Sequence, residues 1–187
     1  MTTRSQTANP AVKRSTTSTA AKRAATPAAG KTVRNLARLN HMKNVETGQF
    51  ISWYKMGFVD RIRTIRSGVP AQRVGELSSV MDMPKEALMD SLGLSRATVN
   101  RKVQRKEMLS PEESERVMGM QALIGQVQAM IDADSAPDFD AAKWLASWIA
   151  APLPALGGAT PASFMDTVEG QKHIGNLLDM AQSGAYA

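Results

Sequence analysis

The stretch of sequence that decides the fold is FDAAKWLASWIAAPLPALGGATPASFMDTVEGQKHIGNLLDMAQSGAYA, residues 139–187. Its first part predicts a helix over residues 139–150, because apolar side chains recur there at helical spacing. These side chains are Trp144, Leu145, Trp148 and Ile149. At least one of the two tryptophans is expected in the core. Strand-like alternation is scarce along the chain, so an all-α protein is predicted.

Two sharp corners follow this helix. Pro152 and Pro154 forbid its continuation, and Gly157 with Gly158 supplies the backbone freedom that a tight reversal needs. Thr160 precedes a proline, which predicts a helical start with a capping hydroxyl.

A final helix is predicted from Thr167 to Gly184. Its apolar side chains share one face: Ile174, Leu177, Leu178 and Ala181. The last three residues, 185–187, then protrude from a compact helical unit.

The middle of the chain predicts four short helices, over residues 49–66, 70–81, 84–92 and 95–106. Gly57 is a weak point in the first of them. A short helix, a turn at Gly93, a cap at Ser95 and a basic helix form the layout of a helix-turn-helix. Val99 and Val103 lie one turn apart and are expected to point inward.

The outer faces of the basic helix predict DNA contact, because such a helix fits the major groove and no acid lies between residues 94 and 106. The candidate DNA-binding residues are Ser95, Arg96, Thr98, Asn100, Arg101, Lys102 and Arg105. Asn100 could pair with adenine, and Arg96 or Arg101 with guanine. A scaffold helix without DNA contact is the alternative.

A long helix is predicted from the start signal at Ser110 to Asp132. Its apolar set is wider than one stripe: Val117, Met118, Met120, Leu123, Ile124, Val127, Met130 and Ile131. Either the helix is buried on two sides or it forms a dimer seam. We expect a homodimer seam, because reading two half-sites requires two copies.

Charge is distributed unevenly along the 187 residues. Nine basic residues and no acid lie between Met1 and Val45, whereas two lysines oppose seven acids from Gln126 onward. The first thirty residues are rich in Ala, Thr and Ser, so we expect residues 1–45 to form a disordered basic tail. This tail is either a nonspecific nucleic-acid arm or a linker. A transit peptide is disfavoured, because only Val12 is a bulky apolar residue before Thr32.

Two sets of motifs resemble the Xre/MbcA/ParS antitoxins. The C-terminal stretch contains W-L, then P-x-L-G-G-x-T-P, D-T-x-x-G, L-L and a final G-x-Y, as in the toxin-binding domain of these antitoxins. The stretch LGLSRATVNRK, residues 92–102, resembles their Xre-like part. Members often read N-P-A-L-G-G where this chain has Leu153 before Pro154, so an asparagine that could fix the turn is missing.

The resemblance implies an antitoxin that neutralises a RES-domain, NAD-consuming toxin and represses its own operon. Because this segment is acidic and ends in a bend with an aromatic residue, we expect its end to block the toxin's active site, with the toxin-binding residues Trp148, Leu156, Gly184, Tyr186 and Ala187. The expected domains are the tail 1–45, an Xre-like helix-turn-helix and dimerisation domain 46–132, and a toxin-binding domain 133–187. The expected partners are the toxin in a hetero-oligomer, operator DNA and a second copy of the chain.

No catalytic apparatus is predicted. His41 and His173 are far apart in the sequence and lack an acidic partner or nucleophile at a suitable spacing, and the chain has no cysteine. We therefore expect no enzyme activity, no metal and no cofactor. We also expect a cytoplasmic protein without a membrane span, because no long apolar run occurs. The alternative functions are a stand-alone transcriptional regulator, whose C-terminal part only oligomerises, and a nucleoid-associated protein.

Overall fold

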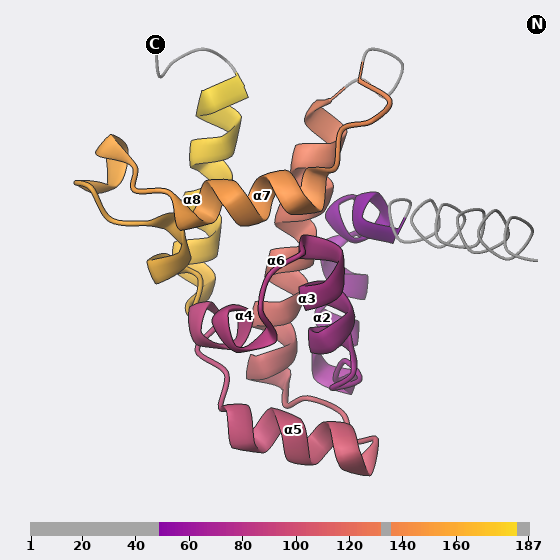
Figure 1. Cartoon of the computed structure of the whole chain (residues 1–187). Coiled ribbons are helices and arrows are strands. Elements are labelled where there is room, and N and C mark those ends of the chain that lie inside the picture. The colour runs from indigo at the N-terminus through magenta and orange to yellow at the C-terminus, as the bar shows by residue number, and fades with distance from the viewer. Residues whose placement is uncertain (1–48, 132–135, 183–187) are drawn as a thin grey trace, which may run out of the picture. The chain divides into compact units, whose positions relative to one another are not determined.

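The computed structural model describes residues 49–131 and 136–182 (Figure 1). Residues 49–54 are helical. The elements that follow are α2 (Phe58–Ser67), α3 (Arg73–Met81), α4 (Lys85–Ser91), α5 (Arg96–Arg105), α6 (Pro111–Met130), α7 (Ala141–Ala150), the 3₁₀ turns η1 (Pro154–Leu156) and η2 (Pro161–Phe164), and α8 (Val168–Gln182). The described part contains no β-strand, only an isolated antiparallel bridge between Pro70 and Met108. The predicted all-α fold is confirmed, and the predicted tail 1–45 lies outside the described residues.

The first predicted helix, 49–66, is interrupted, so its continuity was wrong. The chain leaves the helix after residue 54 and re-enters it at Phe58, with Gly57 in an extended conformation at ψ 147°. Arg61 stabilises the break, because its guanidinium donates to the carbonyl of Tyr54 at 3.2 Å and to two neighbouring carbonyls at 3.4 Å. A helix end leaves carbonyls without intrahelical partners, and Arg61 supplies a donor there.

The start of α3 is also later than predicted. The prediction placed it at Pro70, but α3 begins at Arg73. The preceding residues instead pair with the segment that follows α5: the Leu109 N–H donates to the Val69 carbonyl at 2.8 Å and the Ala71 N–H to the Glu107 carbonyl at 3.1 Å. This bridge closes the helix-turn-helix segment into a loop whose two ends are joined.

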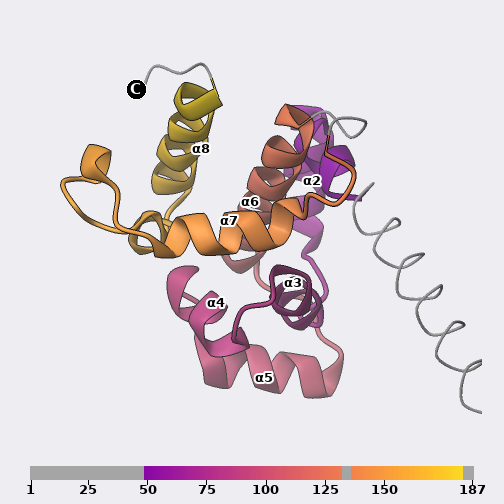
Figure 2. The same cartoon turned by 45° about the horizontal axis from the view of Figure 1, so that its top comes forward.

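The central helix is α6. Ser110 caps it in a capping box with Glu113, as its start signal predicts. Its predicted apolar set is buried within the same chain as far as Val127, because α2, α7 and α8 all pack against α6 (Figures 1 and 2). Met130 is half-buried and Ile131 is exposed. The alternative of burial on more than one side therefore holds for the apolar residues from Val117 to Val127, and the homodimer stays a prediction.

The C-terminal segment follows its predicted order. Gly157 and Gly158 have φ of 64° and 88°, and the Gly158 N–H donates back to the Leu153 carbonyl at 3.0 Å, which closes the tight reversal. Thr160 precedes η2, but its hydroxyl makes no cap, so that detail was wrong. Thr167 does cap α8, because its hydroxyl accepts from the Gly170 N–H at 3.0 Å.

The predicted faces of α7 and α8 are largely correct. Leu145 and Ile149 are fully buried, as are Ile174 and the two leucines that follow it. Ala181, however, is exposed. Neither α7 tryptophan is fully buried: Trp144 is exposed, and Trp148 is half-buried against the core.

One hydrophobic core runs through both predicted domains. α7 packs on α3 as well as on α6, and α8 lies along α6 (Figure 2). Buried Gln171 joins the two parts, because its amide donates to the Met165 carbonyl at 2.8 Å and to the Arg116 carbonyl of α6 at 3.0 Å. Gly119 allows this approach, since a Cβ there would lie 1.7 Å from the Gln171 amide oxygen. The domain boundary between residues 132 and 133 stays a prediction, and the hydrophobic core of the described residues is continuous across it.

Candidate functional site

The outer surface of α5 is the first candidate site. Ser95 caps the helix by accepting from the Thr98 N–H at 3.4 Å, and Val99 is fully buried with Val103 packed beside the core, as predicted. Four of the six candidate DNA-binding residues that follow the cap are exposed: Arg96, Asn100, Arg101 and Arg105. Thr98 is half-buried on the inner edge of the surface.

Acidic residues from other segments balance the charge of α5. Arg96 forms a two-point hydrogen bond with Asp90 of α4, which lowers the pKa of Asp90 and raises that of Arg96. Arg105 lies 3.7 Å from Glu107. The sequence stretch 94–106 has no acid, but its cations therefore have partners that only the fold provides. Among the described residues, Arg101 forms no ion pair.

Lys102 is not on the outer face, so its predicted placement was wrong. Its ammonium donates to Glu113 at 2.5 Å, and the side chains of this pair are only 15% and 13% exposed. Burial raises the pKa of Glu113, but hydrogen bonds from Lys102 and from the Ser110 N–H outweigh it, and the pKa is lowered overall. Lys102 thus fixes α5 on the start of α6.

Asn100 also has a partner from α4. Its amide oxygen accepts from the Lys85 ammonium at 2.8 Å, and both side chains lie at the surface of the helix-turn-helix. The two contacts, Lys85 with Asn100 and Asp90 with Arg96, join opposite ends of α4 to the first two turns of α5.

The turn between α4 and α5 is linked to the C-terminal segment. Gly93 adopts φ +59°, and Arg116 of α6 donates to its carbonyl at 3.0 Å. A Cβ on Gly93 would lie 3.0 Å from the Cβ of Asp166, so the turn closely approaches the segment between η2 and α8. The candidate DNA surface and the C-terminal segment therefore share one rigid support.

The second candidate site is an aromatic face on α7. Trp144 and Trp148 stack with ring centroids 6.0 Å apart and planes 14° apart, and Phe139 lies 6.2 Å from Trp144. Trp144 is 40% exposed, although the adjacent Leu145 is fully buried. We name Phe139, Trp144 and Trp148 the aromatic ladder. Sequence analysis assigned Trp148 to toxin binding but did not predict the ladder, because the stacking of Trp144 on Trp148 and Phe139 is a property of the folded segment.

The remaining predicted toxin-binding residues fall in two groups. Leu156 is half-buried in η1 and packs against the core. Gly184, Tyr186 and Ala187 lie outside the described residues.

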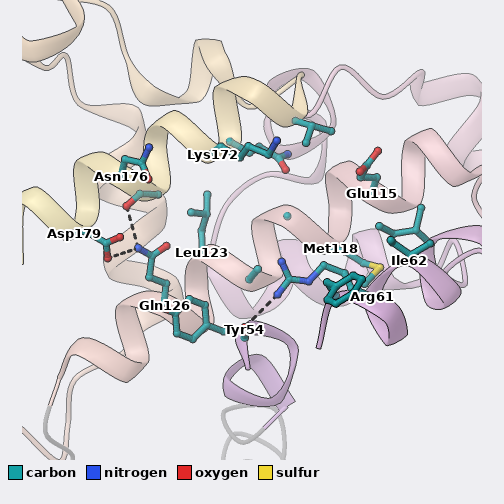
Figure 3. A pocket seen from close by; sticks show the side chains of 17 residues that line it. Tyr54, Arg61, Ile62, Glu115, Met118, Leu123, Gln126, Lys172, Asn176 and Asp179 are labelled. Atoms are coloured by element: carbon teal, nitrogen blue, oxygen red, sulfur yellow. Dashed lines mark hydrogen bonds between the residues drawn. The ribbon is translucent and has the colours of Figure 1, made fainter. Parts of the chain in front are cut away.

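A groove of about 450 Å³ lies between α2, α6 and α8 (Figure 3). Its interior includes Met118 and Leu123, and its α8 rim carries Lys172, Asn176 and Asp179. Gln126 spans the groove, donating to Asp179 at 2.7 Å and to the carbonyl of residue 175. Sequence analysis missed this groove, because its walls come from three segments that are far apart in the sequence.

Within residues 49–131 and 136–182, no group of three His, Cys, Asp or Glu side chains could hold a metal ion. Within the same ranges, no helix is both long and apolar enough to cross a bilayer.

Comparisons with known proteins cover both candidate sites. Residues 60–119 match the family described as the antitoxin Xre-like helix-turn-helix domain. Residues 139–184 match the family described as the antitoxin Xre/MbcA/ParS C-terminal toxin-binding domain. The chain is also similar to a protein named "Prs ADP-ribosylating antitoxin" from Sphingobium sp. (strain YBL2), with 42% identity over 135 residues, which are 72% of this chain and 85% of that protein. The α5 surface lies inside the first match and the aromatic ladder inside the second.

Proposed function

Because this chain belongs to the Xre/MbcA/ParS antitoxins and combines a helix-turn-helix with a toxin-binding domain, we propose that it neutralises a cognate RES-domain toxin. The toxin consumes NAD, and the C-terminal end of this chain blocks its active site. The relative's name refers to ADP-ribosylation and to Prs, and ADP-ribosyl transfer draws its group from NAD. Prs is therefore the first protein to test as the toxin's target.

The aromatic ladder is the observation that carries this proposal. Large aromatic side chains are enriched at the centres of protein interfaces, where they are buried by the partner. Leu145 and Ile149 attach α7 to the core, while Trp144 and Trp148 remain at the surface in a stacked pair. The ladder thus supplies rigid apolar area that a partner can cover.

Charge indicates what kind of surface the toxin presents. Residues 136–182 carry five acids and two lysines, and Asp138 and Asp140 flank Phe139 at the start of the ladder. An arginine-bearing surface fits this arrangement, because guanidinium groups stack on tryptophan and pair with carboxylates. A pocket that binds a dinucleotide pyrophosphate must itself present cations, which suit the acidic balance of this segment.

The test separates docking from inhibition. The full chain is co-expressed with the product of the adjacent gene, and the binding affinity and NAD consumption of the purified partner are measured. We expect Trp144→Ala to weaken binding by about 30-fold or more, a loss typical of an interface hot spot. Tyr54→Ala is the matched control, because Tyr54 is 38% exposed but lies outside the matched toxin-binding residues, and it should bind normally.

Deleting residues 185–187 should leave binding detectable but restore NAD consumption. If the truncated chain still silences the partner, active-site blocking by the terminus is wrong, and a surface-blocking mechanism replaces it. If the full chain neither binds the adjacent product nor protects NAD, the toxin partnership itself is wrong.

Repression of its own operon by a homodimer is the second part of the proposal. The α5 surface and its family match support DNA binding, and two copies would read two half-sites. The chain itself covers the apolar residues of α6 from Val117 to Val127, so we propose the exposed Phe58, Val59 and Ile62 of α2 as the dimer face. Gel-shift and light-scattering measurements with the upstream DNA test both points, and a monomer that ignores this DNA would contradict them.

A further inference from the structure

The geometry points to α4 as the element that orients two base-reading side chains of α5. We propose that Asp90 positions Arg96 for guanine and that Lys85 positions Asn100 for adenine. The chain then recognises DNA that carries a G·C and an A·T pair about two base-pair steps apart. This inference rests on the proposed DNA binding and adds which bases are read and which residues position the readers.

The first pair leaves a guanine-reading edge open on Arg96. A guanidinium has five N–H groups, and Asp90 accepts from Nε and from Nη2. Both hydrogens of Nη1 and one of Nη2 remain, and they point away from the carboxylate along the end of the side chain. Two parallel donors of this kind match the O6 and N7 acceptors of guanine.

The second pair has the same consequence for Asn100. A lysine ammonium only donates, so its contact at 2.8 Å fixes the amide oxygen toward Lys85 and orients the whole amide. The oxygen keeps a second lone pair, and both hydrogens of the amide nitrogen stay available. One acceptor and one donor are what the N6 and N7 edge of adenine requires.

The positions of the readers set the spacing of the bases. Arg96 is the first residue of α5 and Asn100 lies one turn later, about 6 Å along the helix axis. The N-terminal turns of a recognition helix are the ones that reach base edges, and base pairs in B-DNA are stacked about 3.4 Å apart. A helix that follows the groove therefore places its two readers about two steps apart.

Other cations of the surface have different roles. Arg101 is exposed and forms no ion pair among the described residues, so it suits a phosphate, which carries no sequence information. Arg105 is paired with Glu107, as Arg96 is with Asp90, but it lies at the far end of the helix. Glu107 is therefore a control for Asp90, because it carries the same charge but pairs with an arginine at the other end of α5.

The test is selection of DNA from a randomised duplex pool by the full chain, followed by affinity measurements on the selected site and its single-base variants. Wild type should select a guanine and an adenine about two steps apart. Asp90→Ala should reduce discrimination at the guanine by about tenfold and leave the adenine preference unchanged. Lys85→Met should do the reverse.

Glu107→Ala removes the same negative charge and should raise affinity for all sequences without changing either preference. Arg101→Gln should lower affinity evenly and reduce the salt slope by about one. These side chains are at least partly exposed, and a circular dichroism melt checks that each variant folds.

Two results would overturn the inference. If Asp90→Ala behaves like Glu107→Ala, raising affinity with both preferences intact, Asp90 merely masks Arg96. If the selected sites lack the two bases, Arg96 and Asn100 do not read DNA in the proposed way. Failure of the wild-type chain to bind any DNA is a separate result, because it contradicts the proposed DNA binding before any variant is compared.

Discussion

Leu145→Ala tests whether the chain folds as one unit. Leu145 is fully buried in α7, where that helix packs on α3 and α6. Removing its three outer carbons forfeits about 2.4 kcal/mol of transfer free energy, at about 0.8 kcal/mol for each carbon. The cavity left behind adds to this loss, and fully buried leucines in well-packed cores lose about 3–5 kcal/mol in total.

Such a loss is a large share of the free energy of unfolding of a domain, which is about 5–15 kcal/mol. For a folded unit of this size it corresponds to a fall of about 10 °C or more in melting temperature. Because α7 shares its core with α3, the loss should extend to the helix-turn-helix. We therefore expect one urea transition by circular dichroism, shifted as a whole, and faster hydrogen exchange in α3 and α5 as well as in α7 and α8.

Leu153→Ala is the matched control, because Leu153 is half-buried in the loop after α7 and the same atoms are removed. Its effect should be well under that of Leu145→Ala. The reasoning is refuted if Leu145→Ala yields two transitions, with exchange in α3 and α5 unchanged. In that case the predicted domains 46–132 and 133–187 fold independently.

Three further changes probe contacts that the fold creates. Gly125→Ala should destabilise the chain by more than about 1 kcal/mol in urea denaturation, because the new Cβ would lie 2.1 Å from the Phe50 carbonyl oxygen. Gly75→Ala in α3 is the control: its Cβ would meet nothing within 4 Å, and the change should stabilise the chain by about 0.5–1 kcal/mol. Gln171→Leu should cost about 2 kcal/mol in the same assay, since two backbone carbonyls lose their donor, and an unchanged midpoint would contradict the role given to this amide. Because the pKa of Glu113 is lowered from 4.5, the Glu113 carboxylate stabilises the fold above pH 4.5, and this stability is lost as pH falls through the pKa of the folded state. Glu113→Gln should therefore flatten the acid side of a curve of unfolding free energy against pH. An unchanged curve would argue against the Lys102–Glu113 ion pair.

Local signals in the sequence predicted the helices and most of their ends. Ser95, Ser110 and Thr167 cap helices as expected, because a cap depends only on a side chain and the backbone three residues later. The glycine pair 157–158 makes its reversal for the same local reason. The inward face of α5 was also predicted correctly, since Val99 and Val103 recur at helical spacing.

The errors arose where distant segments meet. The wide apolar set of α6 was compatible with a dimer seam or with burial, and only the packing of α2, α7 and α8 shows that its own chain covers it. The break before α2 depends on Arg61 turning back to carbonyls of the preceding helix. Lys102 was expected on the DNA face, and its place is set by Glu113, which lies in another helix.

The sequence by itself determined the helical fold class, the order of the elements and the resemblance to the antitoxins, because caps, turns and periodicity act over a few residues. The tertiary structure decided which cations of α5 remain available, since Asp90 and Glu113, which lie in other helices, reach Arg96 and Lys102 only after folding. It also joined the two predicted domains through Gln171 and one core. The physical reason is that charge pairing and burial depend on distances in space, and residues far apart in the sequence set those distances.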